Sequence, residues 1–327
     1  MCRFLVKLIL FALFAGMIYL VLLLVQGERP KAAVRSNLKY VKGGYGHMYT
    51  RCREVRANLS TDILVLGSSH AYRGFDPRIF YREGYRLFNL GSSSQTPLQM
   101  QVLLDEHLDA LDPDLCLIEV FPNTFQNLGK ESALDLASNC PTSLSMAIMA
   151  LQTKDIVVSN TLAYSWALEQ LGWADEFVEP SVNARSKDRY IPGGFVEYGD
   201  PGYRKVGGAA PKQWDPAPTQ IVAFERCLTS LGAKGAKVVF VFAPVMPSFQ
   251  PSPNVQAALT SYFSSKGQFY DMSALFLPSD TSLFRDDHHL NALGVERFNE
   301  FLITRLKNDG YLLERHLSNT GMQKSEM

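Results

Sequence analysis

A serine-bearing stretch early in the chain could supply a nucleophile. Residues Asp62–Asp76 have the sequence DILVLGSSHAYRGFD, in which an apolar run ends at Gly67 and two serines follow. An apolar run that ends in a small polar turn predicts a buried strand with a loop at its carboxyl end. In open α/β sheets, ligands bind at that end. Because Gly and Ser are also ordinary loop residues, a plain strand-to-helix turn is the alternative interpretation.

A second stretch could supply a base and a partner for it. Residues Phe284–Gly294 have the sequence FRDDHHLNALG, which places Asp286 three residues before His289, just ahead of a predicted helix. In a tight turn, this spacing brings a carboxylate to the Nδ1 side of the imidazole and fixes its tautomer. A serine hydroxyl is a poor nucleophile at neutral pH without a base. We therefore predict acyl transfer, in which Ser69 attacks an ester carbonyl and His289 takes its proton.

The DDHH cluster has two other interpretations. Adjacent Asp and His residues also bind metal ions, but the sequence offers no partner motif with further ligands, so we predict no metal site. A solvated helix start would be favoured if the chain held no candidate nucleophile. We expect the neighbouring His70 and His288 to be local hydrogen-bonding residues rather than catalysts.

Donors for an oxyanion follow three of the predicted strands. The backbone N–H of Ser69 is one, Gly91 could present a second N–H, and Asn123 could add a side-chain NH₂. All three would lie on one rim of the sheet, although Gly and Asn are also common turn residues. Glu119, the one charged residue in the third strand, could point toward the crevice or into water near the strand end. We expect it in water.

The order of predicted elements indicates a three-layer α/β/α fold with a central parallel sheet of about five strands. The predicted strands are 63–66, 86–90, 115–121, 237–243 and 268–271, and helical segments separate them. A long stretch at about 124–216 interrupts the alternation, with a helical part at 143–171, and is interpreted as an insertion over the sheet edge or as mere decoration. We expect the α/β domain to span 61–312, followed by a flexible tail at 313–327.

The N-terminus carries an apolar segment that does not belong to the globular fold. Leu8–Val25 holds no charge and approaches the roughly 20 residues that cross a bilayer. No convincing cleavage site follows it, so we predict an uncleaved signal anchor at 1–27 and a polar juxtamembrane segment at 28–60. Basic residues flank the segment on both sides and do not settle its orientation. A single N-terminal anchor on a large domain favours an extracytoplasmic body, in the periplasm or at the cell surface.

Composition narrows the function classes. The chain has 327 residues, of which 46% are hydrophobic and 20% charged, and its net charge is zero. A balanced charge gives no support for nucleic-acid binding. The five cysteines show no metal-binding spacing. We expect Cys116 to be buried in a strand, and a disulfide among the others is compatible with an extracytoplasmic location, although the sequence does not pair them.

Taken together, these blocks resemble the SGNH (GDSL-like) hydrolase superfamily. They are Gly67-Ser68-Ser69-His70 after the first strand, Asn89-Leu90-Gly91 after the second, Pro122-Asn123 after the third, and the Asp286–Gly294 stretch near the C-terminus. The sequence is most similar to the membrane-anchored branch that contains the D-alanyl transfer protein of teichoic acid synthesis and the alginate O-acetylation proteins. It departs from the family pattern at Ser68, where the family has Asp, and at Phe121-Pro122-Asn123-Thr124, where the family has Gly-x-Asn-Asp.

The resemblance implies a function for the predicted residues. It implies an SGNH/flavodoxin-like sheet, a triad of Ser69, Asp286 and His289, oxyanion donors at Ser69, Gly91 and Asn123, and no cofactor. It also implies an esterase or O-acyltransferase that acts on an acylated glycan or another envelope polymer, together with a membrane-bound acyl-transfer partner. The hypothesis from another class is a non-catalytic scaffold whose insertion binds a polysaccharide or an envelope partner.

Overall fold

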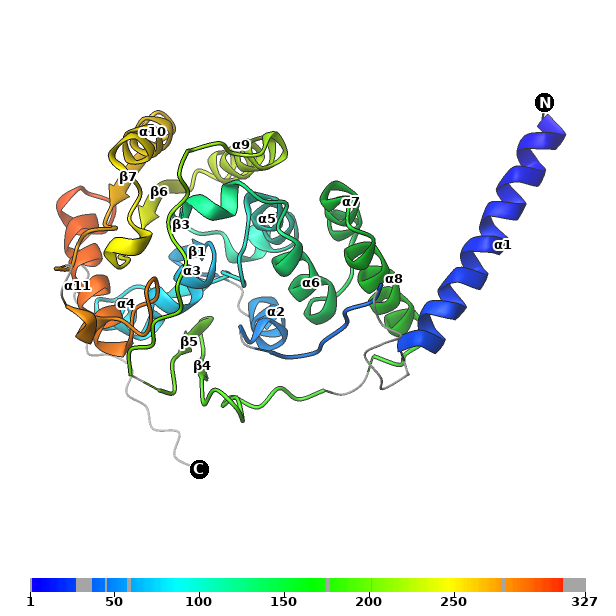
Figure 1. Ribbon diagram of the computed structural model, residues 1–327, viewed down its shortest axis with the longest axis horizontal. Coiled ribbons are helices and arrows are strands. Elements are labelled where there is room, and N and C mark those ends of the chain that lie inside the picture. Colours follow the sequence, from blue (N-terminus) through cyan, green and yellow to red (C-terminus); the bar gives the residue numbers. More distant parts are fainter. Residues whose placement is uncertain are drawn as a thin grey trace.

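Five parallel strands form the central sheet, in the spatial order β2-β1-β3-β6-β7. The strands are β1 (Ile63–Leu66), β2 (Leu87–Asn89), β3 (Leu115–Glu119), β6 (Lys237–Phe242) and β7 (Gln268–Asp271). Counted along the chain, this is the doubly wound order 2-1-3-4-5, in which the direction of winding reverses between β1 and β3. The predicted three-layer α/β fold is confirmed, with helices on both faces of the sheet (Figure 1).

The computed structural model describes residues 2–27, 37–44, 46–57, 60–174, 177–200, 202–277 and 280–313. Most of the predicted tail, 314–327, and residues 28–36 of the predicted juxtamembrane segment lie outside the described residues.

Strands β1 and β3 are buried because both of their faces are covered. Alternate side chains of β1 enter different hydrophobic clusters: Leu64 and Leu66 on one face, Ile63 and Val65 on the other. Strand β3 follows the same pattern, which explains its nearly continuous apolar sequence. The parallel register pairs Leu66 with Ile118, so the carboxyl ends of β1 and β3 lie level.

Helices complete the two outer layers. One face is covered mainly by α5 (Pro97–Leu111), α9 (Pro218–Ala233) and α10 (Pro253–Ser264), and the other by α4 (Pro77–Arg82) and α11 (Ala292–Asn308). Capping residues begin two of these helices: Thr96 and Gln99 form a capping box at α5, and Asp76 caps α4. A short helix, α3 (Ser69–Gly74), begins at the predicted serine loop.

The predicted helical stretch at 143–171 is two helices rather than one. Helix α7 (Leu144–Thr153) ends where Lys154 adopts a left-handed conformation, with φ of 53°. Asp155 then caps α8 (Ile156–Gln170) by accepting the N–H of Val157. The two helices pack against each other and against α6 (Lys130–Asn139), and an antiparallel hairpin of β4 (Arg189–Ile191) and β5 (Phe195–Glu197) follows them.

Part of the predicted juxtamembrane segment instead belongs to the core. Residues 48–57 form α2 (Met48–Ala57), whose Met48, Cys52 and Val55 are buried in the same cluster as α5 and α6. A disulfide joins Cys52 to Cys140, at the end of α6. The sequence did not predict this helix because its apolar positions are few and three arginines interrupt them, one of which, Arg51, is buried.

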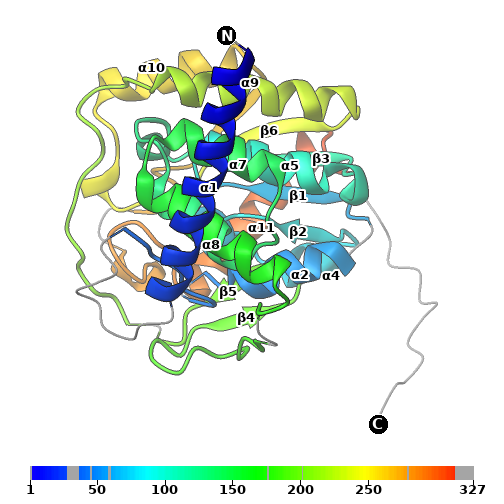
Figure 2. The same cartoon turned by 90° about the vertical axis from the view of Figure 1, so that its right-hand side faces the viewer.

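Most of the N-terminal helix α1 (Cys2–Gly27) stands away from the body of the protein, which it contacts at α8 (Figure 1; the view of Figure 2 is along this direction). Among the described residues it is the one helix long and apolar enough to cross a membrane, and the body buries little of it. A helix of this kind is either a single span or a signal sequence.

The disulfide makes a testable contribution to stability. Replacing Cys52 and Cys140 together by Ala is expected to lower the free energy of unfolding by about 4 kcal/mol, because a long loop of the unfolded chain is no longer closed. Chemical denaturation of the full chain in detergent, with and without a reductant, measures the effect. Reductant should destabilise the natural chain and leave the double variant unchanged. Equal sensitivity of both chains would contradict the prediction.

Candidate active site

The candidate nucleophile follows β1 through a turn that requires glycine. Gly67 has a φ of +144°, and a Cβ atom there would lie 2.6 Å from Cβ of Glu119. The side chain of Ser68 then caps α3 by accepting the N–H of His70 at 3.3 Å. Ser69 is the first residue of α3, so the turn fixes its position at the carboxyl edge of the sheet.

The structure brings the three predicted triad residues together. Oγ of Ser69 lies 2.7 Å from Nε2 of His289, although the two residues are 220 positions apart. Nδ1 of His289 lies 3.0 and 2.9 Å from the two carboxylate oxygens of Asp286. Oδ1 of Asp286 also accepts the backbone N–H groups of His288 and His289, at 3.0 and 2.9 Å, which holds the turn closed. Asn291 caps α11 immediately afterwards.

Electrostatics fixes the direction of these bonds. Burial alone would raise the pKa of Asp286, but its hydrogen bond and charge interaction with His289 hold that pKa well below its ordinary value. The carboxylate is therefore ionised at neutral pH and can only accept. Neutral His289 then keeps its proton on Nδ1, which leaves the lone pair of Nε2 facing the hydroxyl of Ser69.

The predicted oxyanion donors differ in their availability. Among the described residues, no group accepts the backbone N–H of Ser69. Gly91 donates its N–H to Oδ1 of Asn89 at 3.0 Å, so this donor is already engaged. Asn123 lies in a 3₁₀ turn just beyond β3, on the same rim as Ser69, and its Oδ1 is buried without a partner in the described part of the chain.

Glu119 is not in water, contrary to the expectation from the sequence. It is 1% exposed, and its Oε2 accepts both the N–H of Ser68, at 2.9 Å, and its hydroxyl, at 2.8 Å. Burial raises the pKa of Glu119 to about 7, and the two bonds from Ser68 oppose the shift. The sequence does not show which way a charged residue at a strand end points, because it does not show which hydrogen-bond donors the neighbouring loop supplies.

Glu119 begins a second chain of hydrogen bonds beside the triad. Oγ of Ser68 lies 2.9 Å from Nδ1 of His70, and Nε2 of His70 lies 3.2 Å from Nδ1 of His288. An ionised Glu119 only accepts, so each Nδ1–H and the serine hydroxyl must donate toward it. Protonation of Glu119 allows each bond to reverse, which moves the proton of His288 from Nδ1 to Nε2. His70 and His288 are hydrogen-bonding residues, as expected, but the sequence did not predict that they are linked.

The three histidines are close enough to raise the question of a metal ion. His70, His288 and His289 can each offer a nitrogen within 4.8 Å of the others. Burial, followed by the neighbouring histidines, lowers the pKa of His70 well below its ordinary value, and burial and His289 lower that of His288 to about 4. The rings of His70 and His289, however, lie nearly parallel, with 22° between their planes. Their in-plane lone pairs therefore do not converge on one point, and the nitrogens serve the hydrogen bonds already described.

Residues of the insertion cover the candidate site. The guanidinium of Arg73 forms a buried ion pair with Asp188 at 2.8 Å and lies 3.9 Å from the ring centre of Tyr198. The Tyr198 ring in turn packs against His289, with 6.1 Å between the ring centres. Asp287 accepts the N–H groups of 206 and 207, at 3.0 and 2.8 Å. A cavity of only about 10 Å³ remains behind His70, His288 and His289.

Comparison with known proteins gives a likeness of fold. No model of a known protein family matches the chain, and no curated protein matches it. A crystal structure described as an acylhydrolase, from Bacteroides fragilis, is 13% identical with a TM-score of 0.41, covering 82% of this chain and 99% of that one. A GDSL-like lipase from Bacteroides thetaiotaomicron is 12% identical with a TM-score of 0.36, covering 80% of this chain and 99% of that one.

The buried carboxyl of Glu119 predicts a pH effect. In the unfolded chain this group ionises near its ordinary pKa, whereas in the folded chain it holds its proton to about pH 7. Its contribution to stability is therefore present at low pH and is lost as pH rises through the folded pKa. Between pH 5 and 8, Glu119→Gln should gain stability relative to the natural chain by on the order of 3 kcal/mol. Histidine contributions are common to both chains and largely cancel.

Urea unfolding of both full chains at several pH values measures this difference. A difference in the free energy of unfolding that stays constant from pH 5 to 8 would contradict the prediction.

Proposed function

We propose that the chain is a serine-dependent esterase or O-acyltransferase. The observation that carries the proposal is the continuous line of contacts from Ser69 through His289 to Asp286. This arrangement gives a serine hydroxyl a neutral base, and gives the base a carboxylate that stabilises its charged form.

The proposed reaction begins when Oγ of Ser69 attacks an ester carbonyl carbon and its proton passes to Nε2 of His289. Asp286 stabilises the resulting imidazolium without taking its proton. The negative oxygen of the tetrahedral intermediate is met by the N–H of Ser69 and by the side-chain amide of Asn123. The carbon–oxygen bond to the leaving alcohol then breaks, and His289 returns the proton to the alkoxide. Water or a sugar hydroxyl next attacks the acyl-serine, which gives hydrolysis or transfer.

Gly91 is a third oxyanion donor in this proposal under one condition. Its N–H is held by the side chain of Asn89, so it can serve as a third donor only if that bond opens when substrate binds. We therefore assign the main role to Ser69 and Asn123.

We further propose that α1 is retained as a membrane anchor and that the catalytic body is extracytoplasmic. The Cys52–Cys140 disulfide supports this location, because disulfides persist in oxidising compartments. An acylated glycan or another envelope polymer is the proposed substrate, on the basis of the anchor and of the resemblance to the membrane-anchored branch. A membrane-bound acyl-transfer partner belongs to the same proposal.

A non-catalytic scaffold is the alternative function. It would be favoured if Ser69 and His289 stood beyond hydrogen-bond reach, whereas their atoms are 2.7 Å apart. This contact supports the enzymatic function, and the following experiment decides between an enzyme and a non-catalytic scaffold.

A fluorophosphonate probe tests whether Ser69 is activated. We expect one adduct, located at Ser69 by mass spectrometry, that is lost in Ser69→Ala and His289→Ala, with esterase activity reduced about 10⁴-fold or more. Ser93→Ala is the matched control, since Ser93 follows β2 on the same edge of the sheet and its hydroxyl binds Glu131. An adduct at Ser68, or none in folded protein, would overturn the assignment.

The oxyanion role of Asn123 is a separate prediction. Asn123→Ala should lower kcat for a simple ester such as p-nitrophenyl acetate about 10²- to 10³-fold and leave KM nearly unchanged, because the lost bond forms mainly in the transition state. Gln126→Ala, in the same turn, is the control and should retain activity. A value of kcat for Asn123→Ala within a factor of about two of the natural chain would exclude this role.

A further inference from the structure

The outer side of the α7–α8 pair is an exposed apolar surface far from the candidate site in sequence. On α7, Leu144, Ile148 and Leu151 follow one another at helical spacing, and Leu144 and Leu151 are 77% and 75% exposed. On α8, Ile156 and Trp166 are also exposed. Single exposed apolar residues are ordinary, but a contiguous patch on a protein surface usually marks an interaction site.

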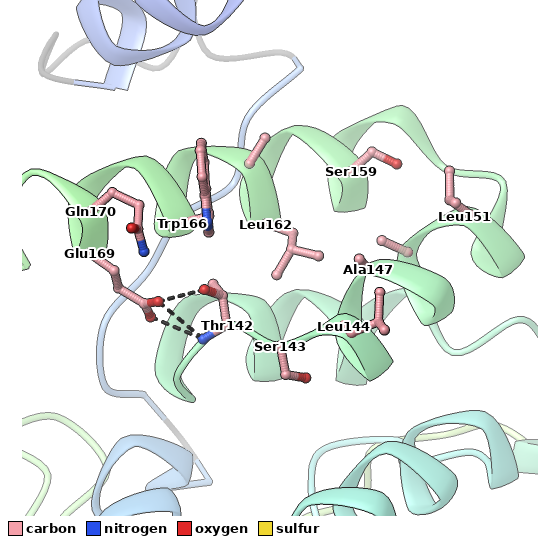
Figure 3. Close-up of a pocket in the computed structure, with 12 residues that line it drawn as sticks. Thr142, Ser143, Leu144, Ala147, Leu151, Ser159, Leu162, Trp166, Glu169 and Gln170 are labelled. Atoms are coloured by element: carbon pink, nitrogen blue, oxygen red, sulfur yellow. Dashed lines mark hydrogen bonds between the residues drawn. The ribbon is translucent and has the colours of Figure 1, made fainter.

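A groove runs between the two helices on this side. Its volume is about 620 Å³, and its lining includes Leu144, Ala147 and Leu151 of α7 with Leu162 and Trp166 of α8 (Figure 3). One end is polar, where Glu169 accepts the N–H of Thr142 at 3.1 Å. The groove is therefore apolar along its length, with its polar groups already bonded at one end.

Charge is nearly absent from this part of the chain. Between residues 143 and 168 only Lys154 and Asp155 are charged, and both lie in the turn that joins the helices. Asp155 is paired with Lys130 at 2.6 Å. A helix pair on the surface of a water-soluble protein ordinarily presents charged residues outward. Because this face lacks them, we do not expect it to lie in water.

The apolar surface adjoins the N-terminal helix. The last turns of α1 pack on α8: Tyr19 donates its hydroxyl to Oδ1 of Asn160 at 2.8 Å, and Leu24 packs in a cluster with Tyr164 and Leu168. Figure 1 shows the C-terminal end of α1 next to α8 and the rest of α1 leaning away from the body, and in Figure 2 α1 crosses in front of the α7–α8 pair. The apolar helix α1 thus leaves the body from the side on which α7 and α8 lie.

We infer that the outer face of α7 and α8 lies in the bilayer beside α1, with lipid acyl chains in its groove. The inference rests on the proposed membrane anchor. If α1 spans the bilayer, the α1–α8 contact holds α8 at the level where the span ends. An uncharged helix pair at that level meets acyl chains and headgroups. Trp166 and the nearby Trp173, 47% and 58% exposed, are of the type enriched at membrane interfaces.

The chain contains its own reporters for a test. It has three tryptophans: Trp166, Trp173 and Trp214. Trp214 packs against Phe125 and Phe263, in the cluster on one face of the sheet, and is the matched control. Two variants of the full chain, each keeping one tryptophan with the other two changed to Phe, separate Trp166 from Trp214.

Both variants are placed in nanodiscs of phosphatidylcholine with brominated or ordinary acyl chains. The emission of the Trp166 chain should fall by about half in brominated lipid, because bromine quenches on contact, while that of the Trp214 chain stays nearly unchanged. Aqueous iodide should quench Trp166 weakly.

Two outcomes would overturn the inference about α7 and α8 without affecting the proposal that α1 is a membrane anchor. Strong iodide quenching of Trp166 in nanodisc-bound protein places the face in water. Quenching by neither agent means that protein covers it, and chemical cross-linking would then show a second copy. A chain that has lost α1 by intact mass and does not enter nanodiscs would instead refute the anchor and, with it, this inference. The fluorophosphonate adduct at Ser69 is read independently of both.

Discussion

Strands β1 and β3 lie side by side in the middle of the sheet, and their parallel register brings both carboxyl ends to one level. Ser69 follows the first strand and Glu119 ends the second, so a buried carboxyl stands directly beneath the nucleophile turn. Burial makes that carboxyl costly unless it is bonded, and the two donors of Ser68 are the bonds it receives. Gly67 is part of the same constraint, since a side chain there would overlap Glu119. The position of Ser69 therefore depends on how Glu119 is satisfied.

The DDHH sequence connects this turn to the rest of the molecule, because each residue faces a different partner. Asp286 orients His289, His288 contacts His70, and Asp287 holds the insertion. The alternatives of a metal cluster and a solvated helix start both treat the four residues as one group. The structure divides them among three separate tasks: orienting the base, contacting His70 and holding the insertion.

Strands β1, β2, β3 and β6 were predictable from sequence because each is a short, mainly apolar run that Gly or Pro follows closely, whereas β7, with the sequence QFYD, does not share this pattern. The contact between Asp286 and His289 was predictable because three residues suffice for a tight turn. Three features were not. The inward side of Glu119 depends on a loop that is distant in sequence. The engagement of the N–H of Gly91 by Asn89 is a local bond that a turn pattern does not specify. The break at Lys154 comes from the left-handed backbone conformation of that residue, which interrupts an otherwise continuous helical pattern.

The insertion at about 124–216 is the part of the fold that sequence patterns predict least well. Its contacts with α2 and with Asp287 indicate that it has a structural role. On one side it is joined to α2, the helix nearest the N-terminal segment, through the disulfide from Cys52 to Cys140 and through the buried guanidinium of Arg51, which donates to the carbonyl of Gly194 at 2.8 and 3.1 Å. On the other side it is held by Asp287, next to the triad aspartate. A long segment that is fixed at both places loses much conformational entropy, and the disulfide and the buried arginine offset that loss. The insertion thus joins α2 to the residues that pack around His289 and Asp287.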